Sequence, residues 1–305
     1  MRLPFFSAIA VFIFAIFHQH SAAAKAEPTT EADQNTIVVI GELERKKRIN
    51  AFIRSAIKIS NDEQYARYNV PVCPISLGLK ADRNSFIETR IRAVAKAAGA
   101  KVAEPECDPN VIVVTTSGSQ DFIAYLRKKH SKVFGAMHIP ARNRLMKGPG
   151  PAYAWNIVRT TSTGGGAPVS GTFDDEEGDG QSFSGSGSRI RQATQQNIDV
   201  AILLIEDTAL LEINPRQLAD YAVMRLLGNA GQPKNQTASE SSILSLFSDR
   251  PEELEAPQSV TAWDLALLKA LYQAPNDLNA QQMRNNMKRI FEKELVKIAD
   301  QGAGE

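Results

Sequence analysis

Two capped helices decide the fold: EINPRQLADYAVMRLLG at residues 212–228 and SVTAWDLALLKALY at residues 259–272. In the first, Asn214 is placed to cap the helix and Pro215 takes the first helical position, where its missing N–H costs nothing. A T-x-x-D cap beginning at Thr261 opens the second. Each stretch carries apolar side chains at helical spacing, so we expect both helices to pack one face into a core.

Length and charge exclude some classes of protein. With 305 residues, 43% of them hydrophobic, the chain can bury a sizeable core as one large domain or two small ones. Charged residues make up 23% of the chain and the formal net charge is +1. A nearly neutral protein has little field with which to steer a polyanion, so we expect no nucleic-acid partner.

The N-terminus has the form of a cleavable secretory signal peptide, residues 1–26. Arg2 is followed by an apolar run at 3–17, and small residues permit cleavage after Ala24 or Ala26. The alternative is an uncleaved anchor, but the run is shorter than the roughly 20 residues that span a bilayer. Later apolar runs are only strand-sized. We therefore expect a periplasmic or secreted protein without an integral membrane segment after cleavage.

Cys73 and Cys107 are the only cysteines. Export exposes them to an oxidising compartment, and a disulfide between them would stabilise the fold by about 3–4 kcal/mol. The alternatives are two buried thiols or two metal ligands. Two cysteines without a nearby histidine make a poor zinc site, which favours the disulfide.

The first part of the mature chain predicts an α/β layer over residues 36–160. Residues 27–35 are typical of a flexible leader, and the β-branched TIVVI at 36–40 predicts a strand. Residues 42–60 have the spacing of an amphipathic helix. Its ERKKR cluster at 44–48 is typical of a solvated helix face, with contact to anionic lipid or phosphate as the alternative.

Helices and strands then alternate with short connections. Prolines make residues 66–80 extended, and Ser85 with Glu88 predicts a capping box for a helix that Gly99 ends. VIVVTT at 111–116 predicts a strand. The following helix at 120–130 begins near Ser119 or Asp121, either of which is placed to cap it. Residues 133–155 form a looser segment before a strand at 156–161.

Residues 161–188 form a glycine-, serine- and acid-rich stretch, typical of a mobile surface loop. A calcium loop or a substrate-edge flap is the alternative, but DDEEGDGQ lacks the ligand spacing of an EF-hand. The remainder, residues 189–305, predicts one long or two short strands and then helices. We expect it to form one domain with the part at 36–160.

The sequence offers little for catalysis. After signal removal only His130 and His138 could supply imidazole to zinc, and they share no helical face. The chain lacks the G-x-S-x-G, G-x-G-x-x-G and P-loop motifs. His138, near Arg142 and Arg144, could bind an anion, although a lone loop histidine is more often incidental. We therefore expect no cofactor and no metal.

The second helix resembles a motif of the zincin-like metallopeptidases. That motif, [ST]-x-x-D-[IL]-x-x-[IL]-x-x-L-Y, follows a helix carrying H-E-x-x-H. The matching residues are Thr261, Asp264, Leu265, Leu268, Leu271 and Tyr272. Over residues 66–290 the chain also resembles uncharacterised exported proteins of alphaproteobacteria that are related to this superfamily. The resemblance implies an α+β fold with a mixed sheet packed with helices and a zincin-like C-terminal half.

At the positions of the two histidines and the glutamate, this chain has Tyr221, Arg225 and Ala222. The resemblance therefore implies a non-catalytic protein that binds an extended peptide or a cell-envelope component. It places the cleft between the helices at 215–227 and 261–272.

The binding residues that we predict are Asp220, Tyr221, Arg225 and Trp263. Asp220 could pair with Arg216 or Arg225 as a structural substitute for the metal cluster, and a solvent-facing pair is the alternative. A divergent metal-dependent hydrolase with relocated ligands remains an alternative. A structural or interaction protein of the envelope that uses the ERKKR helix is another.

Overall fold

The computed structural model describes residues 31–59, 64–135, 137–148, 150–163, 168–170, 191–231, 242–248 and 255–302. The predicted signal peptide and most of the loop predicted at 161–188 lie outside these residues. The chain divides into a short unit, residues 1–43, and a main unit, residues 44–305. The fold and the site described below belong to the main unit.

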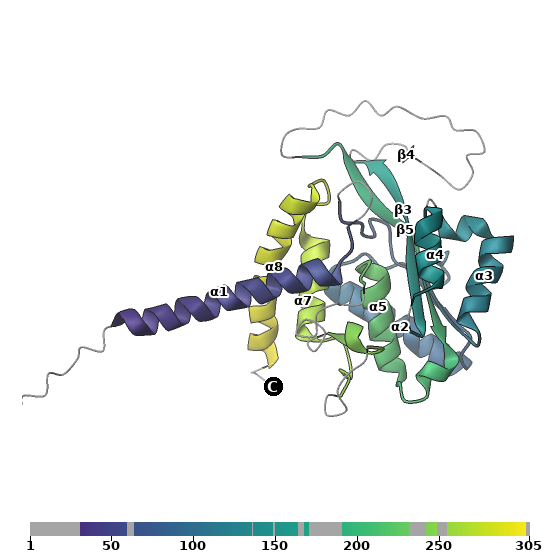
Figure 1. Cartoon of the computed structure of the whole chain (residues 1–305), viewed down its shortest axis with the longest axis horizontal. Helices are drawn as coiled ribbons and strands as arrows, with labels where there is room; N and C mark the ends of the chain where they lie inside the picture. Colours follow the sequence, from purple (N-terminus) through teal and green to yellow (C-terminus); the bar gives the residue numbers. More distant parts are fainter. Residues whose placement is uncertain are drawn as a thin grey trace, which may run out of the picture. The chain divides into compact units, whose positions relative to one another are not determined.

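The centre of the main unit is a five-stranded mixed sheet (Figure 1). Its order is β1 (Pro74–Leu77), β2 (Val111–Thr116), β5 (Thr194–Glu206), β3 (Ala152–Ser162) and β4 (Pro168–Ser170). The first three strands are parallel, and β3 runs antiparallel to both β5 and β4. This confirms the expected α+β class with a mixed sheet.

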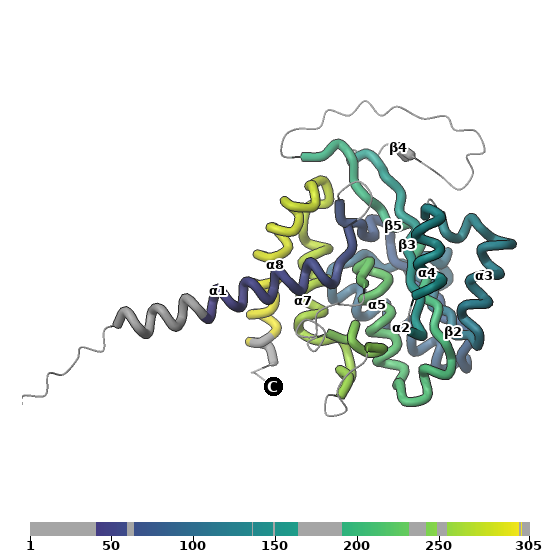
Figure 2. Tube along the Cα trace, in the orientation of Figure 1, coloured from purple at the N-terminus to yellow at the C-terminus, as the bar shows by residue number. Residues whose placement is uncertain are grey.

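Helices cover both faces of the sheet. The α-helices are α1 (Glu31–Ala56), α2 (Ala81–Ala98), α3 (Ser119–Lys129), α4 (Ile139–Met146), α5 (Pro215–Leu227), α7 (Ala262–Gln273) and α8 (Ala280–Gly302). Short 3-10 turns are η1 (Ser131–Phe134), η2 (Asp207–Leu210) and η3 (Ile243–Ser245). Helices α2, α5 and α7 contact one another on one side, and α8 packs against α7 (Figure 2). Helix α3 with η1 covers the other side.

Alternation along β5 divides the interior into two cores. Leu203 and Ile205 face the large core, which contains the buried residues of α2, α5, α7 and α8. Leu204 faces a small core, where Trp155 packs against Phe134 of η1 with ring centroids 5.4 Å apart. Since successive strand residues point to opposite faces, a strand buried on both sides is apolar throughout.

The last turns of α1 are anchored in the large core. Ile49, Phe52 and Ile53 are fully buried. The Phe52 ring lies 5.4 Å from that of Trp263 and 6.0 Å from that of Phe291, in edge-to-face geometry. The helix predicted at 42–60 is therefore present and ends at Ala56.

One prediction near the N-terminus is wrong, because residues 36–40 are helical and not a strand. Residues 31–35, the end of the predicted leader, begin the same helix. β-Branched residues lose only a few tenths of a kcal/mol each in a helix, so five of them do not interrupt one whose flanks favour it.

Helix α2 begins before its predicted start. It starts at Ala81, and no capping box forms at Ser85. Glu88 instead accepts a hydrogen bond from the backbone N–H of Ser76 at 2.9 Å, which ties the helix to β1. The predicted end is confirmed, because Gly99 adopts the left-handed conformation with φ of 89°. The predicted buried face is also confirmed: Ile87, Ile91, Val94, Ala95 and Ala98.

Helix α3 is also capped from a distance. Neither Ser119 nor Asp121 caps it with its side chain. The Glu206 carboxylate, at the end of β5, accepts the N–H groups of Gly118 and Ser119 at 2.7 and 2.8 Å. These hydrogen bonds lower the pKa of Glu206. The segment after α3 is more ordered than predicted, because it forms η1, α4 and the start of β3.

The C-terminal predictions hold more closely. Asn214 caps α5 with Pro215 in the first turn, and Thr261 caps α7 in a reciprocal capping box. Residues 194–206 form one long strand. Gly228 follows α5 with φ of −92°, so it is not a left-handed cap. A Cβ there would lie 3.0 Å from the Met224 carbonyl oxygen, which explains the glycine.

Cys73 and Cys107 form a disulfide, with Cα atoms 6.0 Å apart. The bond ties the start of β1 to the segment that leads into β2. Among the described helices, none is long and apolar enough to cross a bilayer.

Candidate functional site

One edge of β3 has no strand partner along most of its length. β5 pairs with β3 from Ala152 to Ser162, whereas β4 reaches only Thr160 and Thr161. Within the described residues, the outer edge of 152–158 is therefore unpaired. An edge of this kind presents a row of backbone donors and acceptors to an incoming strand.

The phase of the β3–β5 ladder shows which backbone groups face that edge. The Glu206 N–H donates to the Pro151 carbonyl at 2.8 Å. Pro151 and Glu206 are therefore a hydrogen-bonded pair. In an antiparallel ladder, hydrogen-bonded pairs alternate with non-hydrogen-bonded pairs. Tyr153 and Trp155 follow at two and four residues from Pro151, so their N–H and C=O groups are directed to β5.

The intervening residues have the opposite orientation. Ala152, Ala154 and Asn156 turn their backbone N–H and C=O groups away from β5. Elsewhere in the described chain these groups find no backbone partner. All three residues line a hollow of about 590 Å³ that runs beside the strand.

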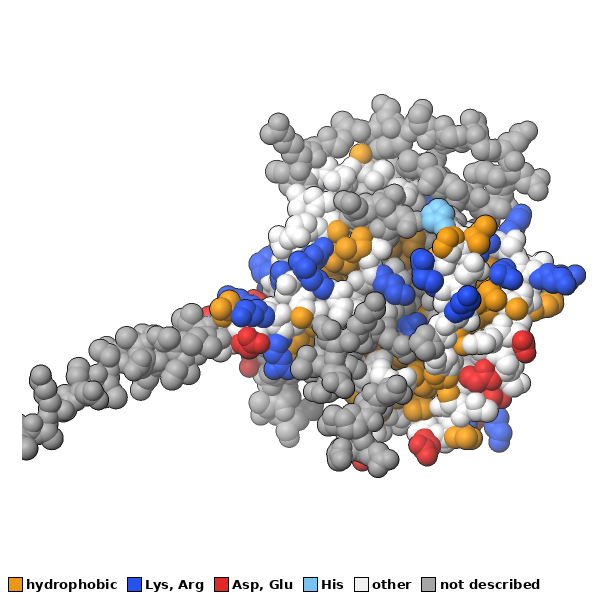
Figure 3. Space-filling view, in the orientation of Figure 1, with side chains coloured by type: hydrophobic (Ala, Val, Ile, Leu, Met, Phe, Trp, Pro, Cys, Tyr) orange, Lys and Arg blue, Asp and Glu red, His pale blue; other side chains and the backbone are white. Residues whose placement is uncertain are grey.

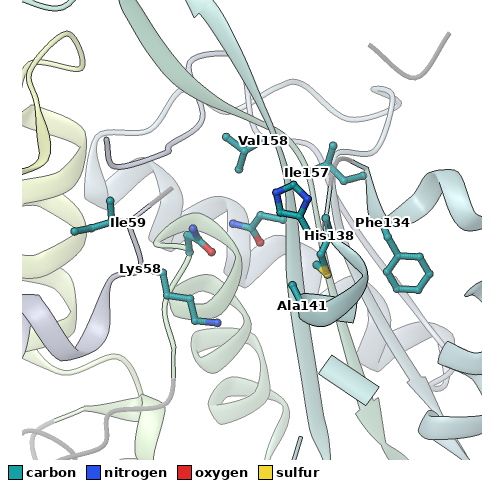
Figure 4. A pocket seen from close by; sticks show the side chains of 10 residues that line it. Lys58, Ile59, Phe134, His138, Ala141, Ile157 and Val158 are labelled. Carbon is teal, nitrogen blue, oxygen red and sulfur yellow. The ribbon is translucent and has the colours of Figure 1, made fainter. Parts of the chain in front are cut away.

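A second hollow of about 210 Å³ continues along β3 past Ile157 and Val158. We call the two together the edge groove. The lining residues that they share are Lys58, Met137, Ala141, Asn156 and Asn229. Figure 4 shows Lys58 and Ala141 on opposite sides of the groove, with Ile157 and Val158 on the strand.

Three distant parts of the chain build the walls. Met137, Ala141 and Leu145 lie on the side of α4 and the small core. The other wall joins the end of α1 to the segment after α5, where the N–H of Lys58 donates to the Asn229 carbonyl at 3.3 Å. Asn229 has φ of 47°, which turns the chain back along α1.

Gly135 brings the α4 wall close to the strand. Its φ of 53° is in the region that favours glycine, and a Cβ at this position would lie 2.9 Å from Cγ2 of Ile157. Arg142 then fixes the turn, because its guanidinium donates to the carbonyls of Met137 and Gly135 at 2.7 and 3.1 Å. Arg142, which we predicted to help His138 bind an anion, therefore uses its guanidinium to hold this turn.

Positive side chains surround the edge groove. The cations Lys58, Arg144 and Arg225 line it together with His138, and among the residues that the structure describes its lining includes no Asp or Glu. Lys and Arg side chains gather beside apolar surface on the face in Figure 3. Partial burial of Lys58, followed by repulsion from Arg225, lowers the pKa of its ammonium. Both causes penalise a cation that has no anion beside it.

Arg225, on the last turn of α5, is the predicted binding residue that lines the groove. It is only 7% exposed. It donates to the Tyr221 hydroxyl, and its guanidinium carbon lies 5.4 Å from the Tyr221 ring centroid. Its Nε has no hydrogen-bond partner, and no carboxylate among the described residues pairs with it. Tyr221 is fully buried, so it supports Arg225 from behind.

The other predicted binding residues are structural. Asp220 is fully buried and pairs with Arg90 of α2, and not with Arg216 or Arg225 as we predicted. Trp263 packs between Phe52 and Phe291, at 5.4 and 5.3 Å. Sequence separation hid both arrangements, because their partners lie on other helices.

The predicted cleft between α5 and α7 is occupied by direct packing. The Tyr272 hydroxyl donates to the Leu227 carbonyl at 3.2 Å. Asp264 accepts from the hydroxyl of Ser242 at 2.5 Å and from the N–H of Ile243 at 2.8 Å, which holds η3 against α7. Burial raises the pKa of Asp264, and these hydrogen bonds oppose that rise. The groove lies instead at the edge of the sheet.

The two histidines do not meet. His130 lies at the end of α3, 5.7 Å from the Tyr125 ring, whereas His138 precedes α4 beside the edge groove. In the part of the chain that the structure describes, no three His, Cys, Asp or Glu side chains converge as metal ligands.

Sequence reasoning missed Lys58, Asn156 and the open strand edge. The apolar pattern at 152–162 predicts a strand but does not say how many partners it has. Comparisons with family models, with curated proteins and with solved structures found no match for this chain. Its function is therefore argued from the site alone.

Proposed function

We propose that this is an exported, non-catalytic protein that binds an extended peptide by adding it as a strand to the open edge of β3. The observation that carries the proposal is the outward-facing backbone of Ala152, Ala154 and Asn156 along the edge groove. Addition of a strand to a sheet edge supplies affinity through main-chain hydrogen bonds and specificity through alternate side chains.

The side chains that line the edge groove, as well as the backbone of β3, are suited to a bound strand. A bound peptide would point successive side chains to opposite walls. One wall offers the apolar side chains of Met137 and Leu145, and the other carries Lys58 and Asn229. The ligand class that fits is a segment that alternates apolar and polar residues.

The chemistry of α5 supports a binding role over hydrolysis. We propose that the C-terminal half is zincin-like, with Tyr221, Ala222 and Arg225 in place of the zinc-binding residues. Alanine has no donor atom, and the guanidinium stays protonated and cannot ligate a cation. The proposal of export rests on the N-terminal sequence, and the disulfide is compatible with an oxidising compartment.

Amide hydrogen exchange of the purified chain tests the open edge. We expect the N–H groups of Ala154 and Asn156 to exchange rapidly, whereas those of Tyr153 and Trp155 are protected by β5. The four residues are neighbours on one strand, so the protected pair is an internal control. Strong protection of Ala154 and Asn156 in the free protein would refute the proposal, because the edge would already be covered.

Binding of a synthetic peptide tests whether the ligand adds as a strand to the edge of β3. The probe is Val-Thr-Val-Glu-Val-Thr-Val-amide with a fluorescent label on its N-terminus, and its binding is followed by fluorescence anisotropy. N-methyl groups on one set of alternate amides should abolish binding, and methyls on the other set should be tolerated, because only one set faces β3. Equal tolerance of both sets would contradict strand addition.

A further inference from the structure

We propose that the edge groove selects extended peptides that carry a carboxylate, and that the carboxylate docks between Lys58 and Arg225. The inference rests on the proposed function, because it names what the bound strand must carry. The carboxylate is that of an acidic side chain or of the peptide's C-terminus.

The first argument is the imbalance of charge. Lys58 and Arg225 both line the larger hollow, and no acidic residue of the described chain lines it with them. Neither cation pairs with a carboxylate within the residues that the structure describes. By contrast, Arg90 and Arg159 have Asp220 and Asp199 as partners. The groove therefore holds two neighbouring cations that no described carboxylate neutralises.

The second argument is the burial of Arg225. Placing a guanidinium where it is 7% exposed carries a desolvation cost that a neutral tyrosine hydroxyl offsets only in part. Its Nε–H remains without an acceptor. A carboxylate in the groove would accept from the part of the guanidinium that lines the hollow and offset part of this desolvation cost by a charge-assisted hydrogen bond.

The third argument is the arrangement of the walls. Ala152, Ala154 and Asn156 point their side chains toward α5, on the same side of the sheet as Arg225, because strand residues alternate. A peptide strand beside β3 would direct every second side chain to that wall. The intervening side chains would meet Met137 and Leu145. The expected ligand is therefore a strand with an acid on one face and apolar residues on the other.

Three peptides separate the source of the carboxylate. The first is the glutamate probe above, the second replaces its glutamate with glutamine, and the third is the glutamine peptide with a free C-terminal acid. We expect the glutamate probe to bind about tenfold or more tightly than the glutamine amide. If the third peptide recovers the difference, the groove reads a terminal carboxylate. If it does not, the groove reads an acidic side chain.

Variants show where the carboxylate binds. Lys58→Met and Arg225→Met should each remove most of the preference for glutamate over glutamine. The matched control is Lys147→Met, because Lys147 is an exposed lysine near the groove that does not line it. Lys58 is only partly covered by its neighbours and belongs to neither core, so its replacement leaves the cores intact.

The outcomes distinguish this inference from the proposed function. Equal binding of the glutamate and glutamine probes, with sensitivity to N-methylation retained, would overturn the carboxylate inference and leave strand addition standing. A preference that survives in both variants would also overturn it. Binding of anionic phospholipid vesicles that depends on Lys58 and Arg225, without binding of any peptide, would overturn both.

Discussion

The ion pair between Asp220 and Arg90 fixes α5, and thereby Arg225, against α2. Asp220 is fully buried and accepts from Nε and Nη2 of Arg90 at 2.7 and 2.9 Å. Its Oδ2 also accepts from the N–H of Val260 at 2.7 Å, which secures the segment before α7. One carboxylate therefore joins three elements. The same hydrogen bonds raise the pKa of Arg90.

Asp220→Asn should destabilise the fold by about 3 kcal/mol. Removal of one partner from a buried pair costs about 3–5 kcal/mol, and we take the lower end because the Arg90 side chain is 25% exposed and can reach water. The amide also directs an N–H toward a donor, because it retains only one acceptor oxygen. For a domain of this size the melting temperature should fall by about 6–12 °C.

Thermal and urea denaturation of the two proteins measure this loss. The matched control is Asp199→Asn, which removes the carboxylate of a pair whose side chains are 32% and 23% exposed. Burial raises the pKa of Asp199 despite its bond to Arg159, so we expect the control to change stability by less than about 1 kcal/mol. A fall of less than about 3 °C for Asp220→Asn, or an equal fall in both variants, would refute the reasoning.

Three further predictions concern the elements around the site. Replacing Cys73 and Cys107 together by alanine should cost about 3–4 kcal/mol for a loop of sequence separation 34, read from the shift in urea midpoint; an unchanged midpoint would contradict it. Glu206→Gln should lower the melting temperature above about pH 4.5, with the difference vanishing as pH falls through the lowered folded pKa; a difference that persists in strong acid would exclude this carboxylate as the cause. Gly135→Ala should cost about 1–3 kcal/mol through strain and its contact with Cγ2 of Ile157, and Ile157→Ala, which removes that atom, should cost less in the Gly135→Ala background than alone; a neutral Gly135→Ala would show that the turn can relax.

Local signals in the sequence predicted local structure. The caps at Asn214 and Thr261 each involve groups within three residues, so both partners of each cap can be recognised in a short stretch of sequence. The disulfide was predictable because only one pairing of two cysteines exists. The end of α2 at Gly99 follows from the freedom of glycine to adopt positive φ.

Interactions between distant segments were not predictable in the same way. Glu88 was expected to cap its own helix but instead bonds to β1, and α3 is capped by a residue 87 or 88 positions away. Asp220 had two arginines nearby in sequence and pairs with a third on another helix. The edge groove joins the ends of α1 and α5 to α4, and no local pattern reveals that meeting.

The open edge of β3 has a consequence for self-association. An unpaired strand edge is a template for the same edge of a second copy, which is a common route to aggregation. In this chain such a dimer would bring two sets of Lys58 and Arg225 together, with no acidic residue of the described groove lining between them. Mutual repulsion should therefore keep copies apart while leaving the edge open to a strand of opposite charge. The cations that we propose as the binding site for a partner's carboxylate would thus also oppose self-association.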